Sequence, residues 1–193
     1  MSPNRRSMKA AFFSSSGPIR LENEDGLLLG EILVDRDSLE PEFRETEPLA
    51  LVAVADGMGG GPGGREAAFL TLTKLAELSQ IPLSAQAPSL LSENLKTAAL
   101  ALTALARRNP SLSQMGSALA GLWLKNEAAL AFNCGDCRVY RVRDGFFDLL
   151  TQDHSLVYEL YANGRLTEEA MGAHPLKNIL TSSIQDSLEE PRL

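Results

Sequence analysis

The chain has 193 residues, of which 44% are hydrophobic and 22% are charged, and its formal net charge is -7. This length is sufficient for one sizeable core, so we expect a single domain over residues 1–193. The acidic balance and the lack of a Lys/Arg-rich run disfavour a nucleic-acid partner or an anionic membrane surface. The apolar stretch near the N-terminus, residues 10–13, is too short for a signal-peptide core or a membrane span, so we expect a cytoplasmic protein.

The first part of the chain predicts strands separated by a polar loop. Apolar runs of strand length occupy residues 8–16, 26–34 and 49–55. Between the second and third runs, residues 35–48 are acidic, contain two prolines and show no periodicity. This composition predicts a solvated loop.

Two amphipathic helices are expected next. Residues 65–80 repeat their apolar side chains at helical spacing. A second helix is expected to start from a cap at Ser92 and to run to Arg107 and Arg108, because cations are favourable at a helix C-terminus. Pro110 then ends it.

The second half of the chain returns to short strands and then to short helices. We predict strands at residues 117–124, 128–133, 137–143 and 146–150. Asp144-Gly145 is a strong signal for a two-residue hairpin turn. A helical period runs from Ser155 to Gly164, and Thr167 caps a further short helix. Strands, helices, strands and helices in this order are typical of an α+β fold.

A glycine-rich stretch holds the best candidate for chemistry. The third apolar run leads into Asp56, and six glycines lie within residues 57–64. An acid at the end of a buried strand is costly to bury unless it is paired or bound to a cation, so Asp56 is a candidate metal ligand. Glycines let the backbone approach a ligand closely, which makes the carbonyl of Gly57 a second candidate. The alternative is a solvated aspartate in a glycine-rich turn.

The two cysteines, Cys134 and Cys137, have the Cys-x-x-Cys spacing of a redox pair or of half a zinc site. There is no second cysteine pair, and His154 and His174 are distant in the sequence. We therefore expect neither a redox nor a zinc role.

Four short blocks follow one another along the chain: Arg-Leu-Glu-Asn-Glu-Asp at 20–25, Asp-Gly-Met-Gly-Gly at 56–60, Met-Gly-Ser-Ala-Leu at 115–119 and Gly-Asp-Cys-Arg-Val-Tyr at 135–140. Together they resemble the motifs of the metal-dependent serine/threonine protein phosphatases of the 2C class, the bacterial branch in particular. The resemblance covers roughly residues 17–185. It implies a four-layer α-β-β-α sandwich of two antiparallel sheets flanked by helices.

The resemblance also implies a metal site, residue by residue. Asp56 would bridge two metal ions, and the carbonyl of Gly57 would complete one of them. Glu24 and Asp25 would hold metal-bound waters, and Asp136 would contribute to a third, weaker ion. These oxygen ligands suit Mn²⁺ or Mg²⁺.

Arg20 is implied to bind the phosphoryl group, since a guanidinium fork matches two phosphate oxygens. The implied activity is hydrolysis of phosphoserine and phosphothreonine by a metal-activated water, on proteins that a serine/threonine kinase has phosphorylated. The alternative for Arg20, Glu24 and Asp25 is a surface turn with local ion pairs. His154 and His174 match positions outside the metal ligands, so we expect them to be structural.

The sequence departs from the family pattern in two ways. Gly61 and Arg65 stand where a histidine and a glutamate are usual. Residues 187–193 contain neither the Ser-Asp-Gly nor the Asp-Asn motif with which family members continue. We therefore expect two further metal-binding aspartates and the C-terminal strands to be missing, relative to the family. The alternative function is a catalytically inactive phosphatase-like module that binds phosphoproteins, or a truncated fragment.

Overall fold

The computed structural model describes residues 8–35, 37–38, 42–46, 51–59, 62–125, 128–185 and 191–193. A central antiparallel sheet dominates it, with the strand order β10-β6-β5-β2-β3 and with β7 also paired to β6. These strands are β2 (Asp25–Leu29), β3 (Ile32–Val34), β5 (Leu51–Met58), β6 (Gly116–Lys125), β7 (Ala128–Cys134) and β10 (Ile184–Gln185). Two further antiparallel pairs form separate two-stranded sheets. They are β1 (Met8–Phe12) with β4 (Glu42–Thr46), and β8 (Tyr140–Arg143) with β9 (Phe146–Leu149).

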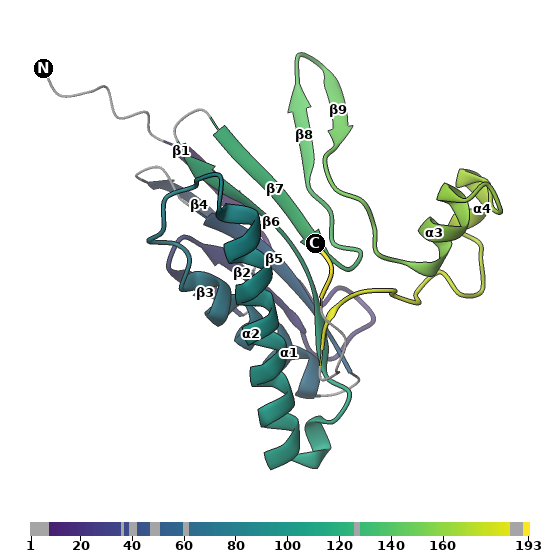
Figure 1. Ribbon diagram of the computed structural model, residues 1–193, viewed down its shortest axis with the longest axis horizontal. Coiled ribbons are helices and arrows are strands. Elements are labelled where there is room, and N and C mark those ends of the chain that lie inside the picture. Colours follow the sequence, from purple (N-terminus) through teal and green to yellow (C-terminus); the bar gives the residue numbers. More distant parts are fainter. Residues whose placement is uncertain are drawn as a thin grey trace, which may run out of the picture.

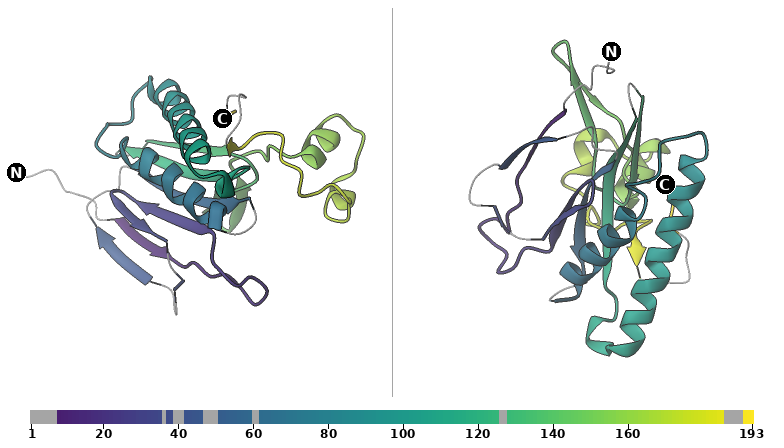
Figure 2. Two further views of the ribbon diagram at one scale, coloured as in Figure 1. Left: turned by 90° about the horizontal axis from the view of Figure 1, so that it is seen from below. Right: turned by 90° about the vertical axis from the view of Figure 1, so that its left-hand side faces the viewer.

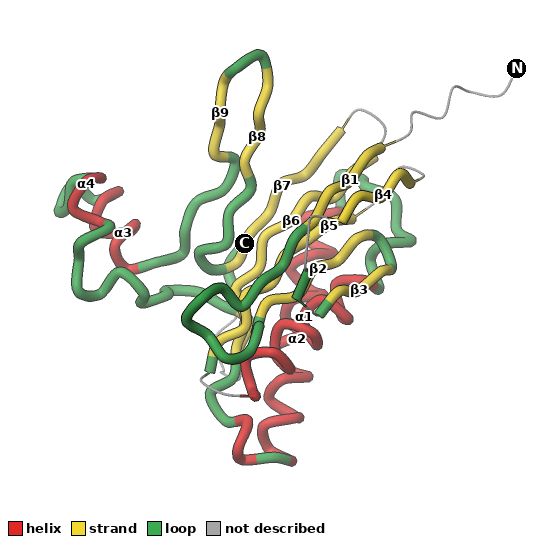
Figure 3. The backbone as a smooth tube through the Cα atoms, turned by 180° about the vertical axis from the view of Figure 1, so that it is seen from behind, coloured by secondary structure: helices red, strands yellow, loops and turns green. Residues whose placement is uncertain are grey.

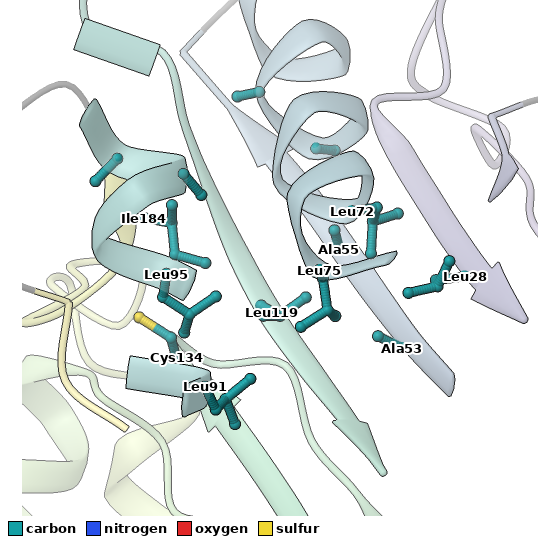
Figure 4. Close-up of a cluster of buried hydrophobic side chains, with 14 of the residues drawn as sticks. Leu28, Ala53, Ala55, Leu72, Leu75, Leu91, Leu95, Leu119, Cys134 and Ile184 are labelled. Carbon is teal, nitrogen blue, oxygen red and sulfur yellow. The ribbon is translucent and has the colours of Figure 1, made fainter. Parts of the chain in front are cut away.

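Two helices cover one face of the central sheet (Figures 1 and 2). They are α1 (Pro62–Ala76) and α2 (Ala87–Arg108), and the short 3-10 helix η1 (Pro110–Leu112) follows α2. Alternate residues of β5 point toward them, because side chains of a strand alternate between its two faces. Ala53 and Ala55 of β5 thus meet Leu72 and Leu75 of α1 in the main core (Figure 4).

The opposite face of the central sheet is also apolar but is covered only in part. Leu27 and Leu29 of β2 form a small second core with Phe12 of β1. An open groove of about 450 Å³ runs over this face, and residues of β1, β2, β5 and β6 line it, including those of the second core. Tyr140 at the base of the β8–β9 hairpin lines the same groove.

The α+β class and the antiparallel sheets agree with the sequence prediction, but the outer layers differ. Helices α3 (Leu156–Ala162) and α4 (Glu168–Met171) lie to one side of the sheets (Figures 1 and 2). They are short, and Val157 is their one buried residue, so they offer little apolar area with which to cover a sheet. In the part of the chain described here, helices therefore cover one face only. None of the described helices is long and apolar enough to cross a membrane.

The element boundaries differ from the prediction in several places, and three of these differences change an element's nature or its start. The run at residues 26–34 is not one strand but two, because Gly30 adopts a φ of +66° and turns β2 back into β3. The segment 35–48 is not entirely loop, since it contains β4, which pairs along β1. Helix α2 begins at Ala87 rather than after Ser92, with Pro88 in its first turn, a position where proline is well tolerated.

Candidate active site

The two central acids meet across neighbouring strands. Asp25 begins β2 and Asp56 lies near the end of β5, and the register of the pair places them directly opposite each other. Cross-strand partners in antiparallel sheets project to the same face, with Cβ atoms about 4.5–5.5 Å apart. That face is the one turned away from α1 and α2, because Ala55 of β5 points into the helical core.

The electrostatics reflect this close approach. Partial burial, followed by the charge of Asp56 and a hydrogen bond between the two carboxyls, raises the pKa of Asp25 to about 6. Partial burial, followed by the charge of Asp136, also raises the pKa of Asp56. Arg20 lowers both pKa values but does not outweigh the other effects. Asp56 is therefore coupled to two neighbouring acids, Asp25 and Asp136, at this end of the sheet.

Glycines allow the surrounding backbone to close around the acids. The amide of Gly57 donates to the carbonyl of Glu24 at 3.2 Å. A Cβ at Gly57 would lie 2.0 Å from the carbonyl oxygen of Gly64 and 2.7 Å from that of Glu24. A Cβ at Gly64 would lie 2.6 Å from Oε1 of Glu24. The glycine loop, the start of α1 and the segment before β2 meet here with no room for a side chain.

Arg20 lies on the loop between β1 and β2. Its Nη1 donates to Oε2 of Glu24 at 2.8 Å, and the side chain of Arg20 is 72% exposed whereas that of Glu24 is 12% exposed. Asn23 anchors the loop, since its Nδ2 donates to Oγ of Ser14 at 2.8 Å and its Oδ1 accepts from the amide of Asp25 at 3.0 Å. Glu24 therefore orients a guanidinium group that remains open to solvent.

Asp136 follows β7 in a tight turn, in which Gly135 adopts a φ of +103°. His154 holds this turn from both sides. Its Nδ1 accepts from the amide of Gly135 at 3.2 Å, and its own amide donates to the carbonyl of Gly135 at 2.8 Å. His154 thus has the structural contacts that the sequence suggested. The other histidine, His174, accepts from the amide of Leu176 in a local turn.

The two cysteines occupy different environments. Cys134 lies in the main core (Figure 4), where burial raises its pKa to about 11 and its thiol lies 3.6 Å from Oγ of Ser182. Cys137 lies near the acids: burial first, and then the charges of Asp56 and Asp136, raise its pKa to about 12. The sequence motifs did not predict that Cys137 lies near the site, although it directly follows Asp136 in the sequence.

Of the two positions that depart from the family pattern, the structure describes Arg65 but not Gly61. Arg65 donates from Nη2 to the carbonyl oxygen and to Oδ2 of Asp35, both at 3.1 Å, and so tethers α1 to the segment after β3. Gly61 lies outside the described residues.

The structure gathers most of the predicted site residues at one end of the central sheet. They are Arg20, Glu24, Asp25, Asp56 and Gly57, with Asp136 close enough for its charge to act on Asp56. Within the described ranges, no group of three or more His, Cys, Asp or Glu side chains is arranged to hold a metal ion. The geometry thus offers a carboxyl pair, a neighbouring third acid and a cationic side chain.

Comparison with known proteins identifies the family. The family model for protein phosphatase 2C matches residues 32–186. A Streptococcus pyogenes protein named as a putative protein phosphatase 2C-type is 36% identical over an alignment of 162 residues, which covers 79% of this chain and 63% of that protein. The serine/threonine protein phosphatase PstP of Mycobacterium tuberculosis is 27% identical over 186 residues, or 96% of this chain and 33% of PstP. The chain thus spans less than two thirds of the length of either relative.

A solved structure extends the likeness to the fold. It is the catalytic domain of a serine/threonine protein phosphatase PstP in complex with two manganese ions, and it matches with a TM-score of 0.75 and 27% identity. The match covers 96% of this chain and 70% of that one. Since the family model matches well over half of the residues, the chain belongs to the protein phosphatase 2C family.

Proposed function

We propose that residues 1–193 form one phosphatase-like domain that hydrolyses phosphoserine and phosphothreonine on proteins with the help of Mn²⁺ or Mg²⁺. The pairing of Asp25 with Asp56 at adjacent strand ends carries the proposal, because it creates an acidic pair with Gly57 beside it. The PstP domain, which shares the fold, binds two manganese ions. Family membership supports the same reaction.

The oxygen atoms that these residues offer are of the type that binds a hard divalent cation. Carboxylate and carbonyl oxygens are the preferred ligands of Mn²⁺ and Mg²⁺. Two partly desolvated carboxyls whose pKa values are both raised form an arrangement that added positive charge stabilises. Asp56 and the carbonyl of Gly57 would hold the ions directly, Glu24 and Asp25 would hold their waters, and Asp136 would hold a third ion. Bound ions of this kind supply a nucleophilic water near neutral pH and positive charge for the phosphoryl oxygens.

Arg20 would bind the phosphoryl group of the substrate. Its guanidinium fork is held by Glu24 at 2.8 Å and is otherwise exposed, so a phosphoryl group on the surface of another protein can reach it. We propose that the partners are cytoplasmic proteins phosphorylated by a serine/threonine kinase. The net charge of -7 disfavours nucleic acid and anionic membrane surfaces as alternatives.

A second candidate is phosphoprotein binding without turnover. It is favoured by one observation, namely that the described residues contain no group of three or more side chains arranged to hold a metal ion. Such a module would bind a phosphopeptide and leave it intact. Arg20→Ala would abolish that binding if the site is the one described here.

Hydrolysis of a small aryl phosphate by the purified chain distinguishes the two candidates. We expect turnover that requires Mn²⁺ and that falls by a factor of about 100 or more in Asp56→Asn, which removes a ligand charge at the reacting group. The matched control is Asp144→Asn, because this aspartate lies in the β8–β9 turn and asparagine tolerates its φ of 53°. A folded chain without turnover that binds phosphopeptide would favour the binding module.

A further inference from the structure

Two aliphatic side chains flank Arg20 and are almost completely exposed. The relative exposure is 90% for Ile19 and 101% for Leu21. The next most exposed large hydrophobic side chain among the described residues, that of Val142, reaches 72%. Single exposed apolar side chains are normal on protein surfaces. Two that flank, in the sequence, a residue assigned to phosphoryl binding offer apolar surface next to that residue.

The loop that presents them is fixed at both ends. On its first side, Ser16 donates from its amide and from Oγ to the carboxylate of Asp37, at 3.0 and 3.2 Å. On its second side, Asn23 is bonded to Ser14 and to the amide of Asp25. The loop projects beyond the end of the central sheet (Figures 2 and 3). Its exposed side chains thus stand on an anchored support, which lowers the entropic cost of binding through them.

We propose that Ile19 and Leu21 determine substrate specificity by contacting apolar side chains next to the phosphorylated serine or threonine. The preferred substrate would then be a phosphoprotein segment with aliphatic residues on either side of the phosphoresidue. This inference rests on the proposed function, because Arg20 must hold the phosphoryl group for its neighbours to meet the flanking residues.

Contact with aliphatic side chains is favourable at these two positions. Burial of an aliphatic side chain against Ile19 or Leu21 removes apolar surface from water on both partners.

Binding of non-hydrolysable peptides tests the proposal without requiring turnover. The probes are two fluorescent peptides of equal length and charge that carry a phosphonate analogue of phosphoserine, flanked by leucines in one and by serines in the other. We expect the chain, in Mn²⁺, to bind the leucine peptide about tenfold more tightly, a factor that corresponds to about 1.4 kcal/mol. In the double variant Ile19→Ser, Leu21→Ser the preference should fall to about twofold or less, and Leu21→Ser alone should give an intermediate value.

The control variant is Leu100→Ser, which changes a 70% exposed leucine on α2 and should keep the full preference. Fluorescence anisotropy gives the affinities, and circular dichroism checks that each variant is folded. Binding that is lost in Arg20→Ala but is equal for the two peptides would overturn this inference and leave the proposed function standing. Equal binding of the phosphonate peptides and their unmodified serine counterparts would overturn the proposed function, and this inference with it.

Discussion

At the scale of single residues, Gly57 has the least room for a side chain among the described glycines. A Cβ there would lie 2.0 Å from one backbone carbonyl oxygen and 2.7 Å from another, and neither can move without shifting its segment. We expect Gly57→Ala to lower the free energy of unfolding by about 2–4 kcal/mol, in the range of overpacked buried sites. Urea denaturation followed by circular dichroism measures the loss.

Gly172→Ala is the matched control, because its Cβ would meet no atom within 4 Å and its φ is -66°. Its free energy of unfolding should stay within about 0.5 kcal/mol of the parent value. If both variants unfold at the same urea concentration, the close approach of the Gly57 and Gly64 backbones is not present in solution.

Asp25 should give the metal-free chain a specific pH dependence. Its pKa of about 6 in the folded chain exceeds the ordinary value of 3.8, so between these values the folded chain binds more protons than the unfolded chain. The contribution of Asp25 to stability therefore decreases as pH rises from about 4 to about 6. Because the carboxyl is partly exposed, we limit this loss to about 1 kcal/mol.

Asp25→Asn should therefore stabilise the metal-free chain at pH 7 and have little effect at pH 4. Urea midpoints of parent and variant, measured in a chelator at both pH values, give the difference directly. A gain of the same size at pH 4 and pH 7 would show that removal of the charge is not its cause.

At the scale of elements, the sequence predicted those turns and helices whose formation depends on residues close together in the chain. Asp144 and Gly145 adopt φ values of 53° and 81° in the β8–β9 turn, as the two-residue hairpin signal required. The helical periods located α1 and α2 because apolar spacing sets the buried face. In contrast, β4 becomes a strand only by pairing with β1, which lies far away in the sequence, so its own residues gave no signal.

Two turn glycines provide a test of whether the β8–β9 hairpin and the central sheet unfold together. Gly145 has a φ of +81° in the hairpin, and Gly30 has a φ of +66° in the central sheet. Alanine at either position costs about 1 kcal/mol of local strain. Since β8 and β9 pack mainly on each other, Gly145→Ala should speed amide exchange in the hairpin and leave the global unfolding midpoint unchanged.

Gly30→Ala should instead lower the global midpoint, because β2 is paired on both sides within the central sheet. Hydrogen exchange and urea denaturation of the two variants separate the outcomes. A global loss in Gly145→Ala as large as that in Gly30→Ala would mean that the hairpin unfolds together with the sheet.

At the scale of the whole molecule, the pairing register of the central sheet brings the site residues together. The sequence motifs named Asp25 and Asp56 separately, and the resemblance gave them related roles. Only the antiparallel pairing of β2 with β5 brings them opposite each other, and only the turn after β7 brings Asp136 near. The proximity of Cys137 and the anchoring of Asn23 to Ser14 depend on the same assembly, which no local pattern encodes.

The central sheet is apolar on both faces, and this predicts a measurable property of the whole chain. The groove of about 450 Å³ exposes apolar side chains of β5 and β6, including Val54 at 41%. Large open apolar surfaces bind the dye anilinonaphthalene sulfonate, which otherwise reports loss of tertiary packing. We expect the native chain to bind this dye while Trp123, its one tryptophan, retains a native near-ultraviolet circular dichroism signal, since its Nε1 donates to the carbonyl of Ile81 in the core.

Val54→Lys should lower the dye fluorescence severalfold by placing a charge in the lining of the groove, without loss of the tryptophan signal. Leu100→Lys, on the outer side of α2, is the control and should leave the fluorescence unchanged. The groove is the source of the dye signal if only the first variant weakens it. Dye binding that persists in Val54→Lys, or that appears only when the tryptophan signal is lost, would show that this face is covered in solution.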